Sequence, residues 1–364
     1  MTEEGVPHVP DTPPQSDAAP LIDERVALWA ARLVVPGRRE DPESAARLRT
    51  EVAADLPRID AAARRWTELG TDLSPTEVRV VGRVGWVRAN LESMRGAFDP
   101  LRERLGASRR VVASRVLGAQ LGALLGLLSM KVLGQYVLPL GGPGGGQLLV
   151  VGPNVLELGR ERGELAADVR RTVLLHEVTH RLQFDATPWL GDHLRGIVDR
   201  YLGAARVDTA ALAEVAADLP GAVAEVVTSG DVQPLLRVVL TPEQRDVIDE
   251  AQGLMSLLEG HGNAAMHGAT EGVIDDPDGV RDHLASRRND LVSRVLTAVA
   301  GLEMKRRQYR EGEAFVDGVI ARAGVAGLNR AFEDPDHLPR GGEVADPDGW
   351  LARVSADADG DAGR

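Results

Sequence analysis

Most of the chain places apolar residues at the period of an α-helix. The clearest case is residues 241–266, TPEQRDVIDEAQGLMSLLEGHGNAAM, in which apolar positions recur every three to four residues. Thr241, Pro242 and Gln244 at its start match the pattern of a capping box with proline in the first helical turn. The segment is therefore predicted to be one long helix, with Glu259 well inside it.

Three other segments carry a helical pattern. Residues 74–94 open with the same capping signature, residues 155–185 form one long pattern that ends before Pro188, and residues 301–324 form another. Gly324 is the expected stop of the last of these. We predict a helix over each segment.

One segment is typical of a β-strand. Residues 147–155, QLLVVGPNV, begin with an apolar run that follows the glycine-rich loop 141–146 and ends at Gly152 and Pro153. The predicted fold class is therefore mainly α with a small β-sheet (α+β). We expect one domain over 21–355, a disordered N-terminal arm over 1–20 and a disordered acidic tail over 356–364.

Composition and charge exclude several classes of site and partner. The 364-residue chain has no cysteine, so disulfides and thiolate metal ligands are excluded, and its net charge of −13 argues against nucleic-acid binding. The apolar stretch 116–130 is shorter than the roughly 20 residues of a membrane span, and its glycines at every fourth position suit a closely packed core helix. With no secretory signal pattern at the start, we expect a cytoplasmic protein without a membrane partner.

The stretch RTVLLHEVTHRLQF, residues 171–184, contains the pattern H-E-x-x-H. On a helix, His176 and His180 project from one face one turn apart and can reach the same cation. Glu177 is offset, so it is placed to take a proton from a water molecule bound to zinc. Arg181 is a charged residue where strict metalloprotease patterns have an uncharged one.

A catalytic zinc needs a third protein ligand, and Glu259 is the best candidate. Its predicted helix neighbours are apolar, so a carboxylate there would be costly to bury unless it met a cation. Glycines at 260 and 262 would let the two helices approach closely, and Asn263 could orient the carboxylate. His261 and His267 are rival third ligands, and His261 could alternatively line the cleft and stabilise an oxyanion.

Five stretches together resemble an actinobacterial family of zincin-like metallopeptidases: LHEVTHRLQF, PWL, LLEGHG, RQYREGEAFV and LPRGGEVADPDGWLARV. The resemblance covers roughly residues 25 to 355. Family members are commonly labelled hydrolases, and one branch is associated with biosynthesis of a deazaflavin coenzyme. The family is similar to gluzincins, which implies a zinc ion held by His176, His180 and Glu259.

The sequence thus predicts a zinc-dependent hydrolase, most simply a metallopeptidase, in which zinc-bound water activated by Glu177 attacks a peptide-like carbonyl. Tyr309 and His261 are the candidates for assisting residues. The alternative is a non-catalytic binding or assembly protein that uses the metal for stability. A peptide or other amide is the expected substrate class, and the pattern specifies no oligomeric state.

Overall fold

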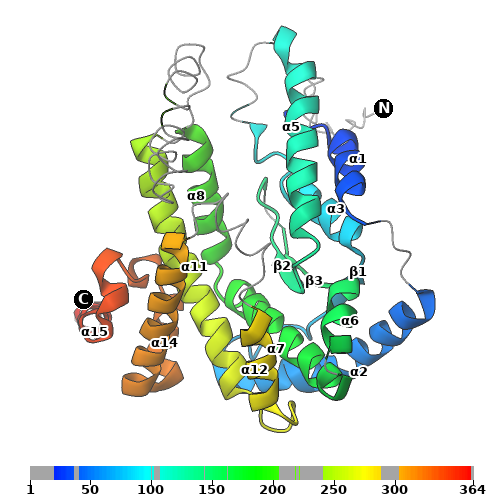
Figure 1. Ribbon diagram of the computed structural model, residues 1–364. Coiled ribbons are helices and arrows are strands. Elements are labelled where there is room, and N and C mark those ends of the chain that lie inside the picture. Colours follow the sequence, from blue (N-terminus) through cyan, green and yellow to red (C-terminus); the bar gives the residue numbers. More distant parts are fainter. Residues whose placement is uncertain are drawn as a thin grey trace, which may run out of the picture.

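The computed structural model describes residues 20–36, 41–99, 101, 107–142, 144–161, 163–204, 218, 221, 241–287 and 303–361. Its described part is mostly helical and contains one small sheet (Figure 1), as the predicted fold class requires. None of the described helices is long and apolar enough to cross a lipid bilayer.

The sheet has three strands in the order β1-β3-β2. Strand β3 (Gln147–Val151) is central; β1 (Val78–Val81) pairs with it in parallel and β2 (Gly134–Val137) antiparallel. Four of the five residues of β3 are buried, because helices cover both faces of the sheet. Strand β2 is therefore the edge strand on the side opposite β1.

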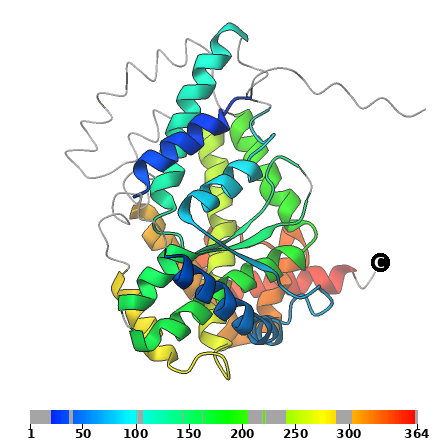
Figure 2. The same cartoon turned by 90° about the vertical axis from the view of Figure 1, so that its right-hand side faces the viewer.

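Helices α1 (Glu24–Val34), α3 (Arg83–Ser93) and α5 (Ala107–Leu128) cover one face of the sheet (Figure 2). The glycines of α5 face α1: a Cβ on Gly118 would lie 2.6 Å from the carbonyl oxygen of Asp23, so the helices touch through their backbones. The predicted close packing is confirmed. The prediction of a buried core helix is wrong for the outer face of α5, where large apolar side chains are exposed.

The other face carries α2 (Pro42–Thr67), α6 (Gly152–Glu161) and α7 (Ala166–Asp185). Helix α7 lies between α2 and the sheet and also contacts α11 (Pro242–Gly268). It is the most deeply buried helix of this layer, with both its motif region and its N-terminal half packed against neighbours.

Helix α11 connects this layer to the C-terminal helices. Its Leu254 and Leu258 pack with α8 (Leu190–Gly203), whereas Leu257 packs with α14 (Glu303–Asn329) and α15 (Pro347–Asp361). Figure 1 shows α14 and α15, in orange and red, on the side of α11 away from the sheet. Shorter elements complete the described chain: 3-10 helices at Gly163–Leu165, Arg330–Phe332, Pro335–His337 and Gly341–Ala345, and α12 at Pro277–Arg287.

Several predicted elements are confirmed. The strand in 147–155 is β3, and α11 begins with the expected capping box of Thr241 and Gln244. Gly324 interrupts α14 with a φ of 69°, a conformation that glycine adopts without strain.

Other predictions need correction. The first part of 74–94 is strand β1, because Val78–Val81 pairs with β3; helix starts only after Gly82. Residues 155–185 belong to two α-helices, α6 and α7, with the 3-10 helix Gly163–Leu165 between them. Helix α15 continues through Asp361, into the stretch expected to be a disordered tail. The predicted N-terminal arm lies almost wholly outside the described residues.

A buried ion-pair cluster fixes α7 to α2. Asp55 of α2 accepts hydrogen bonds from Arg170 at 2.8 Å and Arg171 at 3.3 Å, and its side chain is only 9% exposed. Burial opposes ionisation, but hydrogen bonds and charge from Arg170, Arg58 and Arg171 hold the pKa of Asp55 below its usual value.

We expect Asp55→Asn to lower the free energy of unfolding by about 3 kcal/mol at pH 7, since it removes the buried carboxylate that Arg170 and Arg171 share. A carboxyl with a lowered folded-state pKa stabilises above its unfolded pKa of about 3.9 and loses that contribution as pH falls further. The difference between wild type and variant should therefore shrink below about pH 4.

Urea unfolding at pH 7 and at steps down to pH 3 measures this difference. Glu51→Gln is the matched control: it removes a more exposed partner of Arg170, 41% exposed, and should cost less than about 1 kcal/mol. Equal effects of the two substitutions would contradict the assignment of the buried cluster.

Candidate metal centre

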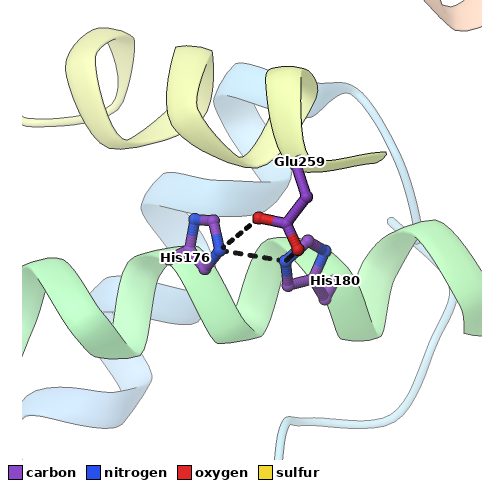
Figure 3. Close-up of side chains that lie close together, drawn as sticks. All are labelled: His176, His180 and Glu259. Atoms are coloured by element: carbon purple, nitrogen blue, oxygen red, sulfur yellow. Dashed lines mark hydrogen bonds and ion pairs between the residues drawn. The ribbon is translucent and has the colours of Figure 1, made fainter. Parts of the chain in front are cut away.

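Helix α7 presents the two motif histidines side by side (Figure 3). His176 and His180 lie one turn apart, with ring centroids 4.5 Å apart, and their Nε2 atoms are 3.0 Å from each other. Their side chains are 17% and 12% exposed, so each ring is largely packed inside the protein. The apolar residues around the motif, Val173, Leu174, Leu175, Val178 and Leu182, are all buried and hold this part of α7 in place.

Glu259 reaches the same point from α11 (Figure 3). Its Oε2 lies 3.4 Å from Nε2 of His176, and its Oε1 lies 3.7 Å from Nε2 of His180. The structure thus brings together the three residues proposed as ligands, from helices that are distant in sequence. Among the described residues, this is the group of histidines and carboxylates whose ligand atoms converge closely enough for one ion.

The distances fit a metal ion. Ligands bound tetrahedrally to zinc at 2.0–2.1 Å are about 3.3 Å from one another. The three measured separations, 3.0, 3.4 and 3.7 Å, bracket that value. Two imidazoles and one carboxylate are also a donor set that zinc accepts.

Glycine at 262 makes this approach possible. A Cβ there would lie 2.9 Å from Cε1 and 3.0 Å from Nδ1 of His176. Gly260 packs against a different helix, because a Cβ there would meet Val316 and the backbone of Gly312 in α14. The expectation that both glycines face the metal helix is therefore correct for Gly262 and wrong for Gly260.

Glu177 lies beside the ligands, against strand β2. A Cβ on Gly134 would come 2.5 Å from Cγ of Glu177, so the carboxyl group packs directly on the strand backbone. Burial raises the pKa of Glu177 to about 7; the negative charge of Glu259 adds to this rise, while His176 and the backbone N–H of Tyr136 work against it. A group with this pKa can both accept and release a proton near neutral pH.

The ligand side chains also have shifted pKa values. Burial, together with the neighbouring His176, lowers the pKa of His180 to about 4. Burial disfavours charge on His176 and on Glu259, but their mutual hydrogen bond and attraction outweigh it: the pKa of His176 is raised and that of Glu259 is lowered to about 2. The site therefore carries negative charge on Glu259, which attracts a cation.

Arg181, the unusual charge in the motif, faces away from the metal ligands. Its guanidinium donates to Asp185 at 3.0 Å, to the hydroxyl of Thr76 at 2.6 Å and to the carbonyl of Ser74 at 2.9 Å. These hydrogen bonds join α7 to the segment before β1, on a side of the helix away from His176 and His180.

The predicted assisting residues have different positions. His261 has no exposed surface; its ring lies between Trp66 and Phe332, and Nδ1 contacts Gln183. Tyr309 belongs to α14, but its side chain is outside the described part of the structure. The roles predicted for both stay predictions.

Two other expectations concern residues of α11. Among the described residues, the three that converge do not include His267, the rival ligand. No hydrogen bond joins Asn263 to Glu259 in the described structure. The proposed ligand that does have a polar partner of this kind is His180, which contacts Gln183.

Sequence reasoning missed two contributions to the site. Gln183 lies three residues after His180 and therefore on the same face of the helix, which is the signal that could have found it. The contact of Gly134 with Glu177 depends on how β2 crosses α7, and no local pattern encodes it.

Comparisons with known proteins agree with this geometry. No curated protein matches the chain. A solved structure from Chloroflexus aurantiacus, described as a "putative hydrolase with a novel fold", is similar to it with a TM-score of 0.62 and 28% sequence identity, over 92% of this chain and 99% of that one. The model of the zincin-like metallopeptidase family matches residues 22–351. The chain therefore belongs to the zincin-like metallopeptidase family.

Proposed function

We propose that the protein is a zinc-dependent hydrolase that cleaves a peptide or another amide. The observation that carries the proposal is the convergence of His176, His180 and Glu259 within ligand distance, with the buried carboxyl of Glu177 beside them. Family membership and the similar hydrolase structure support the reaction class.

His176 and His180 would hold the zinc through Nε2, and Glu259 through its carboxylate. When bound, zinc supplies a Lewis acid and lowers the pKa of water toward 7. Glu177 then accepts a proton on a carboxylate oxygen as the carbonyl is attacked and delivers it to the leaving nitrogen. The contacts of Gly134 and Tyr136 with Glu177 keep that carboxyl oriented between these two transfers.

The environment of Glu177 favours catalysis over a purely structural metal site. Glu177 is 7% exposed and forms no ion pair with a cationic Lys or Arg among the described residues. Burying a carboxyl in this way lowers stability, and a scaffold that used the metal only for folding would gain nothing from it. The deazaflavin association implied by the sequence resemblance stays a prediction.

Glu177→Gln tests the catalytic role. We expect hydrolysis of a peptide library to fall by roughly 10³-fold, since the amide cannot take up the proton. Zinc content, measured by mass spectrometry of metals, should remain near one ion per chain, because the three ligands are intact.

Two controls frame that experiment. Glu259→Ala should lose zinc and activity together, and a chelator should remove wild-type activity until zinc is restored. Full activity in Glu177→Gln would contradict the role of Glu177 as the base. Wild-type protein that binds zinc but hydrolyses no member of the library would contradict the proposed hydrolase and favour the binding or assembly protein.

Gly262→Ala tests the geometry of the helix contact. Its added methyl group would push α11 away from His176 and separate the ligands, so we expect zinc affinity to fall by at least about tenfold, a free-energy change of about 1.4 kcal/mol. Competition with a chromophoric chelator gives the affinity. Gly260→Ala is the matched control, because its methyl group points at α14; equal affinities of the two variants would contradict the assigned contact.

A further inference from the structure

A chain of hydrogen bonds begins at Nδ1 of His180, the ring nitrogen on the side away from Glu259. Nδ1 of His180 is 2.8 Å from Oε1 of Gln183, and Nε2 of Gln183 is 3.0 Å from the carbonyl oxygen of Leu258. The same Nε2 is 3.0 Å from Nδ1 of His261. Gln183 and His261 have no exposed surface, so water does not substitute for these partners.

The chemistry of the partners fixes every hydrogen in this chain. The carbonyl of Leu258 only accepts, so the Gln183 atom facing it must be the NH2 group, and the Gln183 oxygen must face His180. A carbonyl oxygen cannot donate, so Nδ1 of His180 carries the hydrogen and its Nε2 keeps a free lone pair. The second N–H of Gln183 points at His261, whose Nδ1 is therefore the acceptor and whose Nε2 carries the hydrogen.

We propose that Gln183 is a positioning residue of the metal site, which holds His180 in the one tautomer able to bind a cation through Nε2. This inference rests on the proposed function. Gln183 acts on both helices at once: the carbonyl that it binds belongs to Leu258, the residue directly before the ligand Glu259, and His261 follows two residues later. One side chain thus aligns a ligand of α7 with a ligand of α11.

His261 is the outer support of this arrangement. Its Nε2 is buried and has no hydrogen-bond partner among the described residues, an arrangement that lowers stability. Its Nδ1, in contrast, has the geometry to accept from Gln183. In this arrangement His261 acts on the proposed metal site through Gln183.

If Gln183 only joined the two helices, replacing it would change the stability of the protein and nothing else. A positioning Gln183 also changes how tightly and in what geometry the ion is held. The affinity for zinc and the visible spectrum of the cobalt-substituted protein report on the second role, and thermal unfolding of the metal-free protein reports on the first.

Gln183→Met keeps the length of the side chain and removes its hydrogen bonds to His180, to the carbonyl of Leu258 and to His261. We expect zinc affinity to fall 10- to 100-fold and the cobalt absorption bands to shift, because His180 loses the partner that orients it. Asn154→Leu is the matched control. Asn154 of α6 is another buried amide, which donates to the carbonyls of Ser129 and Val132 and bonds to none of the proposed ligands, so its loss should lower thermal stability and leave zinc affinity within about twofold.

A second measurement needs no substitution. Nitrogen-15 NMR of the histidine rings in metal-free wild-type protein at pH 7.5 should show His180 with its hydrogen on Nδ1 and His261 with its hydrogen on Nε2. The opposite tautomer at His180 would overturn the inference even if Gln183→Met failed to fold.

The outcomes separate the two proposals. Wild-type protein that binds zinc, with an unchanged affinity and cobalt spectrum in Gln183→Met, would overturn the role of Gln183 and leave the proposed hydrolase standing. Wild-type protein that binds no zinc would overturn the proposed function and this inference with it.

Discussion

The contact between α7 and α11 at Gly262 is the constraint on which the site depends. Two imidazoles on one helix offer only two ligand atoms on one side of an ion. The third ligand must therefore come from another helix whose backbone packs closely against the first. The absence of a side chain at 262 lets α11 lie against the ring of His176 and brings Glu259 within 3.4 Å of it. Helix α2 and the sheet pack against α7, and α14 packs against α11. These contacts maintain the distance between α7 and α11.

The same contact brings two carboxyl groups together at a place that little solvent reaches. Glu177 is buried and Glu259 is partly buried near the two histidines, and without a cation the charge of Glu259 helps to raise the pKa of Glu177. A divalent ion would balance two carboxylates, so its presence would favour the ionised form of both. The site thus has a composition that is costly in the metal-free protein and electrically balanced with a dication.

The features that the sequence predicts correctly are mostly those encoded by residues close together in the chain. The capping box of α11, the strand of β3 and the two histidines follow from residue spacing, since each belongs to one helix turn, one apolar run or one motif. Glu259 lies on another helix, and its apolar neighbours and the family resemblance, not its spacing, make it the predicted third ligand. The stretch VRVV of β1 is too short to distinguish the helical period from the strand period, and only its pairing with β3 makes it a strand. The burial of His261 between Trp66 and Phe332 likewise depends on packing between segments that no spacing connects.

The position of the ligands along the chain has a consequence for the order of folding. Glu259 follows His180 by 79 residues, and the chain between them includes all of α8. Closing a loop of that length costs conformational entropy before any contact across it is gained. Local helices and the layer around α7 can form without that closure, so an ion would meet the complete set of proposed ligands only in a chain that has already collapsed. Metal occupancy would therefore be a property of the native state and would not guide the early steps that lead to it.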